Sequence, residues 1–158
     1  MMFGRRPLSR LEMGLYAGIV ATLLAVFVRQ AMDYMEIAER AAMQATLNNA
    51  VSAINFRLGY NVLTSGAPQD ADWATRNPFE IARMSPPNFA GDVESSRVVS
   101  LASGSWAFDT GAAELVYLPR LSARLETEDR DGLIRFRLQR QSGRLGYVLV
   151  PTTTYRWE

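Results

Sequence analysis

The chain has 158 residues, enough for one domain plus a further segment, and its formal net charge at pH 7 is +1. It has no histidine, cysteine or lysine, so all 17 basic residues are arginine. These absences exclude a histidine base, thiolate zinc sites, disulfides and lysine Schiff bases, and leave only carboxylate, serine, tyrosine or arginine chemistry. The low net charge gives no bulk attraction to nucleic acid. We therefore expect neither an enzyme nor a nucleic-acid-binding protein.

A long helix is predicted over residues 9–58, because this stretch has no proline and its only glycines lie near its start. Its first part, Leu11 to Val28, is predominantly apolar and would be about 27 Å long at roughly 1.5 Å per residue. That length is close to the roughly 30 Å of a bilayer core, so residues 11–28 are expected to span a membrane. A cleaved secretory signal is the competing interpretation, but helix-forming sequence continues unbroken past Arg29.

The charges on either side of this span predict its orientation. Arg5, Arg6 and Arg10 precede it, whereas Asp33 and Glu36 follow it. The positive-inside rule then places the N-terminus in the cytoplasm and the rest of the chain on the far side of the membrane.

Small residues recur at helical spacing inside the span. Gly14 and Gly18 form a GxxxG motif, and Ala17 and Ala21 extend the same face. Small residues let membrane helices approach closely, so this face is a candidate for packing against another helix. The plainer interpretation is that glycine and alanine are ordinary residues of membrane helices.

The second part of the predicted helix carries one apolar stripe, typical of a helix that covers a folded domain. The stripe consists of Met43, Leu47, Val51, Ile54 and Leu58. Residues 59–95 are rich in proline and glycine and are expected to be a connection, with a helical turn at Pro78 to Met84. Residues 96–158 alternate apolar and polar side chains and predict an antiparallel sheet with one wet face. The expected strands are Val98–Ala102, Trp106–Asp109, Glu114–Leu118, Leu133–Arg140 and Leu145–Val150. The predicted fold is α+β, with a long N-terminal helix packed on a C-terminal antiparallel sheet.

Residues Leu8–Met13, with a basic segment (residues 1–8) before them and the long helix after them, resemble the start of type IV pilins and type II secretion pseudopilins. Glu12 matches the glutamate of that family, and Pro7 stands where the family has the glycine before the prepilin peptidase cleavage site, with Leu8 after it. Further segments are similar to some pilin-like proteins, namely Asn77–Phe79, Pro86–Gly91, Trp106–Asp109 and Leu115–Tyr117.

The resemblance implies a structural subunit, a minor pilin or pseudopilin, that self-associates through its N-terminal helix. Its expected partners are other pilin-like subunits, assembly-platform proteins, the prepilin peptidase and the lipid bilayer. It also implies a single-pass protein of the bacterial inner membrane, with its domain in the periplasm or in an extracellular filament. The alternative is a non-polymerising anchored binding or scaffold protein of the cell envelope.

Glu12 has two interpretations. The resemblance implies that its carboxylate pairs with the N-terminal amine of a neighbouring subunit. The residues themselves indicate a capping box, in which Ser9 caps the helix and Glu12 bonds back to the Ser9 backbone.

Three further groups of charged residues are candidate sites. No cofactor is expected, but Glu126, Glu128, Asp129 and Asp131 are a candidate calcium site, against the plainer interpretation of a solvated turn. Asp109 and Glu114 are the carboxylates that a hydrolase would use, which is the least favoured function. Arg135 and Arg137 share one strand face and could contact phosphates, but nearby acids nearly balance their charge and favour a solvated sheet face.

Overall fold

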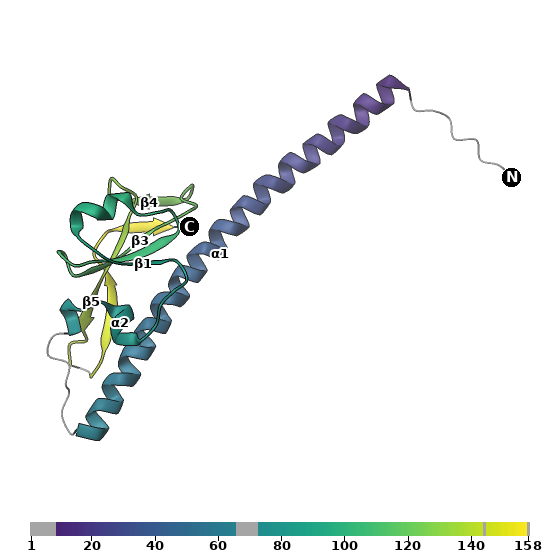
Figure 1. The fold of residues 1–158 in the computed structure, drawn as a ribbon. Helices are drawn as coiled ribbons and strands as arrows, with labels where there is room; N and C mark the ends of the chain where they lie inside the picture. Colours follow the sequence, from purple (N-terminus) through teal and green to yellow (C-terminus); the bar gives the residue numbers. More distant parts are fainter. Residues whose placement is uncertain (1–8, 66–72, 144, 158) are drawn as a thin grey trace. The chain divides into compact units, whose positions relative to one another are not determined.

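The computed structural model describes residues 9–65, 73–143 and 145–157, in two compact units, Met1–Glu36 and Ile37–Glu158. One helix, α1 (Arg10–Ser65), provides the secondary structure of the first unit and begins the second (Figure 1). The predicted leader-like segment, with Pro7 and Leu8, lies outside the described residues. The architecture is α+β: in the second unit α1 packs against a mostly antiparallel sheet, as predicted.

The helix is longer than predicted, because α1 continues through Gly59 to Ser65 and has 56 residues. An internal glycine costs a helix only about 1 kcal/mol relative to alanine, too little to end it where helical residues follow. The predicted end at Leu58 was therefore wrong, and the connection to the sheet is shorter than 59–95.

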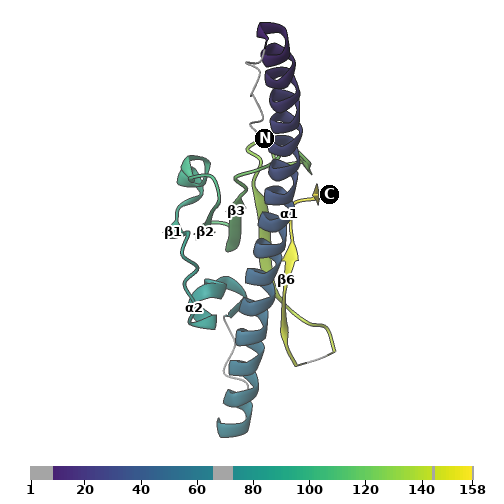
Figure 2. The same cartoon turned by 90° about the vertical axis from the view of Figure 1, so that its right-hand side faces the viewer.

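The main sheet has five strands in the order β1-β2-β3-β5-β6. Strands β2 to β6 pair antiparallel, whereas β1 runs parallel to β2. Its strands are β1 (Phe89–Val93), β2 (Ser105–Asp109), β3 (Glu114–Leu118), β5 (Ile134–Arg140) and β6 (Tyr147–Pro151). A separate two-stranded sheet joins β4 (Leu125–Thr127) to β7 (Tyr155–Trp157). A short helix, α2 (Pro78–Ala82), lies on one flank of α1, and β6 lies on the other (Figure 2).

The core lies between α1 and the sheet, where four of the five residues of the predicted stripe are buried and Val51 is half-buried. Met43, Leu47, Ile54 and Leu58 are at most 4% exposed. They pack in two clusters against Trp106, Tyr117, Phe136, Leu138, Tyr147 and their neighbours. Trp106 and Tyr117 are register partners on β2 and β3, with ring centroids 4.5 Å apart. The stripe therefore covers the sheet, as its helical period predicted.

The sequence predicted that the face of the sheet opposite α1 is exposed to solvent. This prediction was wrong in part, because apolar side chains are buried on that face as well. Val98 packs there against Ala107 and Val116. Val98 belongs to a 3-10 helix, η2 (Ser95–Ser100), and not to the predicted strand Val98–Ala102. A strand needs alternate residues to be buried, but Val98 is the one buried residue of this segment and Val99 is 63% exposed.

Strands β1, β4 and β7 were missed in the sequence, each for a local reason. β1 contains Gly91 at φ 93° and a register shift, and its sequence, with a glycine and an aspartate in five residues, lacks the β-branched and aromatic run typical of a strand. β4 and β7 have three residues each, too few for a period to be recognised. Another 3-10 helix, η1 (Trp73–Thr75), places Trp73 beside Tyr147 in the core. The remaining strands lie within two residues of their predicted bounds.

Candidate functional site

The first candidate is the apolar surface of α1 between Leu11 and Met35, which is uncovered. Leu11 is 82% exposed and Phe27 is 70% exposed. The most apolar window of α1 has a mean hydropathy of 2.0, and none of it is buried. Among the described residues, α1 is the one helix long and apolar enough to cross a membrane. An apolar surface of this extent needs lipid or other protein around it.

The small residues of this segment do not pack against other described parts of the chain. A Cβ added at Gly14 or Gly18 would meet no atom within 4 Å. Ala17 and Ala21 are exposed as well. Contacts among residues 9–65, 73–143 and 145–157 therefore require neither glycine, and the face is open to close approach by another helix.

The N-terminus of α1 has the geometry of a capping box. The backbone N–H of Ser9 donates to Glu12 Oε2 at 2.7 Å, and the backbone N–H of Glu12 donates to Ser9 Oγ at 3.2 Å. Each side chain thus accepts a bond from the other residue's backbone, as in the S-x-x-E motif. The carboxylate of Glu12 is engaged by its own helix in this arrangement.

Two residues that the sequence did not single out attach α1 to the sheet domain. Glu39 Oε1 accepts the hydroxyl of Tyr117 at 2.8 Å and the backbone N–H of Arg120 at 2.6 Å, and Oε2 accepts the backbone N–H of Leu121 at 2.9 Å. Arg40 donates to the backbone carbonyl of Trp157. The only signal in the sequence was a pair of adjacent charges in a stretch rich in alanine and methionine, which is ordinary on a helix surface.

Tyr117 is perturbed by this contact. Its burial raises the pKa of the phenol well above the usual value, and the hydrogen bond and negative charge of Glu39 raise it further. The charge of Arg120 acts in the opposite direction and is the smallest contribution to the pKa. The phenol therefore stays protonated and donates to Glu39 throughout the neutral range.

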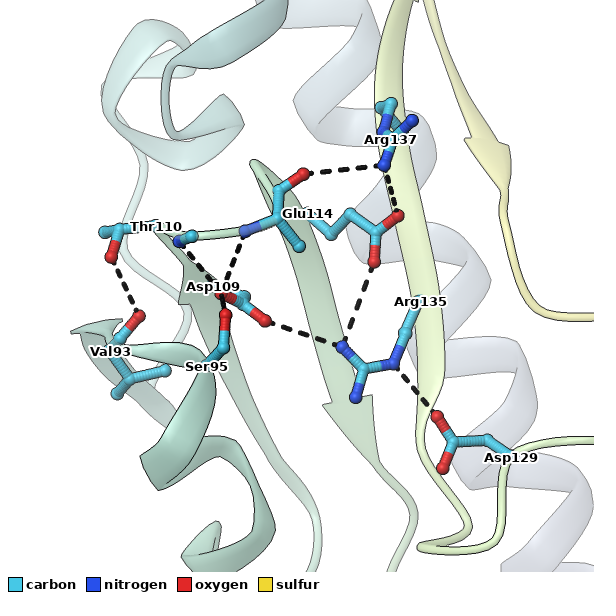
Figure 3. A network of polar contacts seen from close by, with 10 residues as sticks. Val93, Ser95, Asp109, Thr110, Glu114, Asp129, Arg135 and Arg137 are labelled. Carbon is cyan, nitrogen blue, oxygen red and sulfur yellow. Dashed lines mark hydrogen bonds and ion pairs between the residues drawn. The ribbon is translucent and has the colours of Figure 1, made fainter.

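The second candidate is a buried polar network on the far face of the sheet (Figure 3). Asp109 and Glu114 are register partners at the ends of β2 and β3, and are 2% and 6% exposed. Asp109 Oδ1 accepts the hydroxyl of Ser95 at 2.5 Å and the backbone N–H groups of Gly111 and Ala112 at 3.0 and 3.1 Å. A Cβ at Gly111 would lie 2.5 Å from Ser95 Oγ, so a larger residue there would displace the Ser95 hydroxyl that bonds Asp109.

Arg135 lies between three carboxylates of this network (Figure 3). Its guanidinium is 3.6 Å from Asp109 Oδ2, 3.8 Å from Glu114 Oε2 and 2.9 Å from Asp129 Oδ2. Arg137 pairs with Glu114 Oε1 at 2.8 Å. The two arginines that could have formed a phosphate-binding patch are therefore engaged by acids of the same chain. The saturated contacts of Asp109 favour a structural role over a hydrolytic one.

The four acids of the candidate calcium loop have separate environments. Glu126 and Glu128 are exposed, whereas Asp129 bonds Arg135 through Oδ2 and the backbone N–H of Asp131 through Oδ1 at 2.9 Å. Within residues 9–65, 73–143 and 145–157, no three acidic side chains are grouped as a metal ion would need.

No family model, curated protein or solved structure matches this chain. Its function has to be inferred from its own residues and their geometry.

Proposed function

We propose that this chain is a membrane-anchored structural subunit, similar to a minor pilin or pseudopilin, that self-associates through the apolar part of α1. The observation that carries the proposal is the uncovered apolar surface from Leu11 to Met35, on a helix whose later residues cover a sheet. The first part of the helix thus suits lipid, and its later part packs against a sheet. This arrangement suits a subunit that is anchored in a membrane and carries a folded domain.

The arginines before the span give the proposed orientation. Arg5, Arg6 and Arg10 favour a cytoplasmic N-terminus, so the sheet domain is exported to the periplasm of a bacterial cell. The resemblance of Leu8–Met13 to the pilin motif supports an inner-membrane location, with other pilin-like subunits and assembly-platform proteins as partners.

Cysteine cross-linking tests the self-association directly, because the natural chain has no cysteine. Gly14→Cys and Gly18→Cys place thiols on the small-residue face, and Leu23→Cys is the matched control on another face of the span. In oxidised membranes, we expect disulfide dimers from both glycine positions and few or none from Leu23→Cys. Equal yields at all three positions, or no dimers, would contradict packing through this face.

The second candidate function is a non-polymerising anchored scaffold. The capping box favours it, because Glu12 already has a partner in Ser9 and needs no amine from a neighbour. Exchange of residues 11–28 for an unrelated transmembrane helix would then leave the function intact.

The intact mass of the membrane-extracted protein, from cells with and without prepilin peptidase, separates the two functions. Loss of residues 1–7 only in the presence of the peptidase supports a processed, polymerising subunit. A full-length chain in both strains supports the scaffold, with Glu12 acting as a helix cap.

A further inference from the structure

A groove in the sheet-bearing unit combines aromatic side chains with two arginines. It lies between α1 and the end of α2 and has a volume of about 360 Å³, within the usual range of ligand pockets. Its lining includes Phe56, Arg57, Tyr60 and Asn61 from α1, and Ile81 and Arg83 from α2 and its cap. None of the described residues that line it is acidic.

The aromatic side chains of the groove are exposed and are not needed to cover the sheet. Phe56 is 78% exposed and Tyr60 is 61% exposed, whereas Ile54 and Leu58 on the same helix are 0% and 1% exposed. Phe56 and Tyr60 are one helical turn apart, so they lie on one face and form a continuous apolar wall. The core therefore gives no reason for these two residues to be aromatic.

Arg57 is held in place at the groove by a backbone carbonyl and pairs with no acid of the described residues. Its Nη1 donates to the carbonyl of Ile81 at 2.9 Å, in the last turn of α2. A guanidinium has five N–H donors, and this is the one bond that Arg57 makes to the described residues. Its guanidinium is therefore oriented, and no acid among the described residues neutralises its positive charge.

Arg83 occupies a backbone position that favours glycine. It caps α2 in the left-handed conformation, at φ 53° and ψ 41°, and the N–H of Met84 donates to the carbonyl of Phe79 at 3.0 Å. This is the geometry in which glycine is the usual residue, since any side chain is strained there. The Arg83 side chain makes no hydrogen bond or ion pair to the described residues, so no contact within them offsets the strain.

We propose that this groove binds a short acidic peptide segment of a partner protein. An apolar side chain of the segment packs between Phe56 and Tyr60, and a neighbouring carboxylate pairs with Arg57 and Arg83. Carboxylates bind guanidinium groups through charge-assisted, often bidentate hydrogen bonds, and neither arginine has such a partner among the described residues. The strained Arg83 is then explained by its contact with the partner. The inference holds for a filament subunit and for a scaffold alike.

Selection from a random-peptide phage library tests the proposal, with the full chain in neutral detergent micelles as the target. We expect enriched peptides in which aspartate or glutamate neighbours leucine, isoleucine or an aromatic residue. For one synthesised peptide, Arg83→Gly and Phe56→Ser should each weaken binding at least tenfold by fluorescence anisotropy. Because glycine relieves the strain, Arg83→Gly should unfold at the same temperature as the natural chain or higher.

Matched controls lie outside the groove. Leu63→Ser changes an 87% exposed apolar residue of α1, and Arg97→Gln removes an exposed arginine. Both should bind the peptide with unchanged affinity. The proposal is overturned if no peptide is enriched, if the enriched peptides lack carboxylates, or if Arg83→Gly binds them equally. Binding of phosphatidylglycerol vesicles that is lost in Arg83→Gly, without peptide binding, would assign the groove to lipid instead.

Discussion

Glu39 and Tyr117 join α1 to the sheet through a hydrogen bond of 2.8 Å between the phenol and the carboxylate. The same carboxylate accepts two backbone N–H groups just after β3, at Arg120 and Leu121. Hydrogen bonds to a charged group typically contribute about 1.5–3 kcal/mol each to stability. One helix residue therefore holds both a strand side chain and the turn that leaves the strand.

Glu39→Ala is expected to lower the free energy of unfolding by about 2 kcal/mol, because Tyr117 loses its partner while the more exposed N–H groups turn to water. Urea titration of the full chain in neutral detergent, followed by tryptophan fluorescence, measures it. All three tryptophans lie in the sheet-bearing unit and report on that unit. Gln44→Ala, an exposed change on the same helix, is the control, and an equal loss there would contradict the role of Glu39.

The raised pKa of Tyr117 predicts that the protein loses stability at alkaline pH. The folded state raises the pKa of its phenol above the usual value of about 10, so above that pH the unfolded chain releases a proton that the folded chain keeps. The unfolded state then binds fewer protons, and stability falls as pH rises, by up to about 1.4 kcal/mol per pH unit.

The comparison with Tyr117→Phe isolates this effect. The variant is expected to lose less stability than the natural chain between about pH 10 and 11.5, because its side chain at 117 cannot ionise. Tyr155, whose pKa is also raised by burial, remains in both proteins and contributes equally. Parallel stability curves for the two proteins over this range would show that Tyr117 is not the group responsible.

The helix and the central strands could be predicted because each shows a clear period in the sequence. The stripe from Met43 to Leu58 and the alternation in β5 both reflect one buried face, and burial dictates residue type. Local signals failed where long-range contacts decide the structure. Val98 packs in the core although it belongs to a 3-10 helix, and β1 contains Gly91 but forms because it pairs with β2.

The polar contacts were harder to foresee than the core. The capping box was visible because its two residues are three positions apart. Glu39, by contrast, meets partners 78 to 82 positions away, a spacing that a single sequence does not reveal. The groove beside α2 could not be predicted for the same reason, because Arg57 and Arg83 are brought together only by the fold. Charge alone on a helix surface does not distinguish such residues from solvated ones.

Asp109→Asn is expected to destabilise the domain by about 2 kcal/mol, because the hydrogen bonds of the buried carboxylate lose their charge and Arg135 keeps only Glu114 and Asp129 as ion-pair partners. Urea titration measures the loss, and Glu128→Gln, which alters an exposed carboxylate, should change stability by less than about 0.5 kcal/mol. A protein that folds normally with Asp109→Asn but loses a hydrolytic activity would instead identify Asp109 as a catalytic residue.

Asn55 closes part of the outer edge of the sheet. From α1, its Nδ2 donates to the carbonyl of Tyr147 at 3.0 Å, and its Oδ1 accepts the Tyr147 backbone N–H at 2.7 Å. The side-chain amide thus pairs with the first residue of β6 as a neighbouring strand would. Since β6 is the last strand in the sheet order, this contact covers backbone groups that could otherwise pair with another chain.

Asn55→Ala removes both bonds at a buried residue, Tyr147, which is 3% exposed. We expect a loss of about 2 kcal/mol in unfolding free energy, and amide hydrogen exchange at Tyr147 at least tenfold faster than in the natural chain. Exposure of this edge should also raise the tendency to aggregate when the domain is warmed. Asn48→Ala, two turns earlier on the helix, should leave the exchange rate at Tyr147 unchanged. Unaltered exchange in Asn55→Ala itself would mean that the pairing does not protect the strand edge.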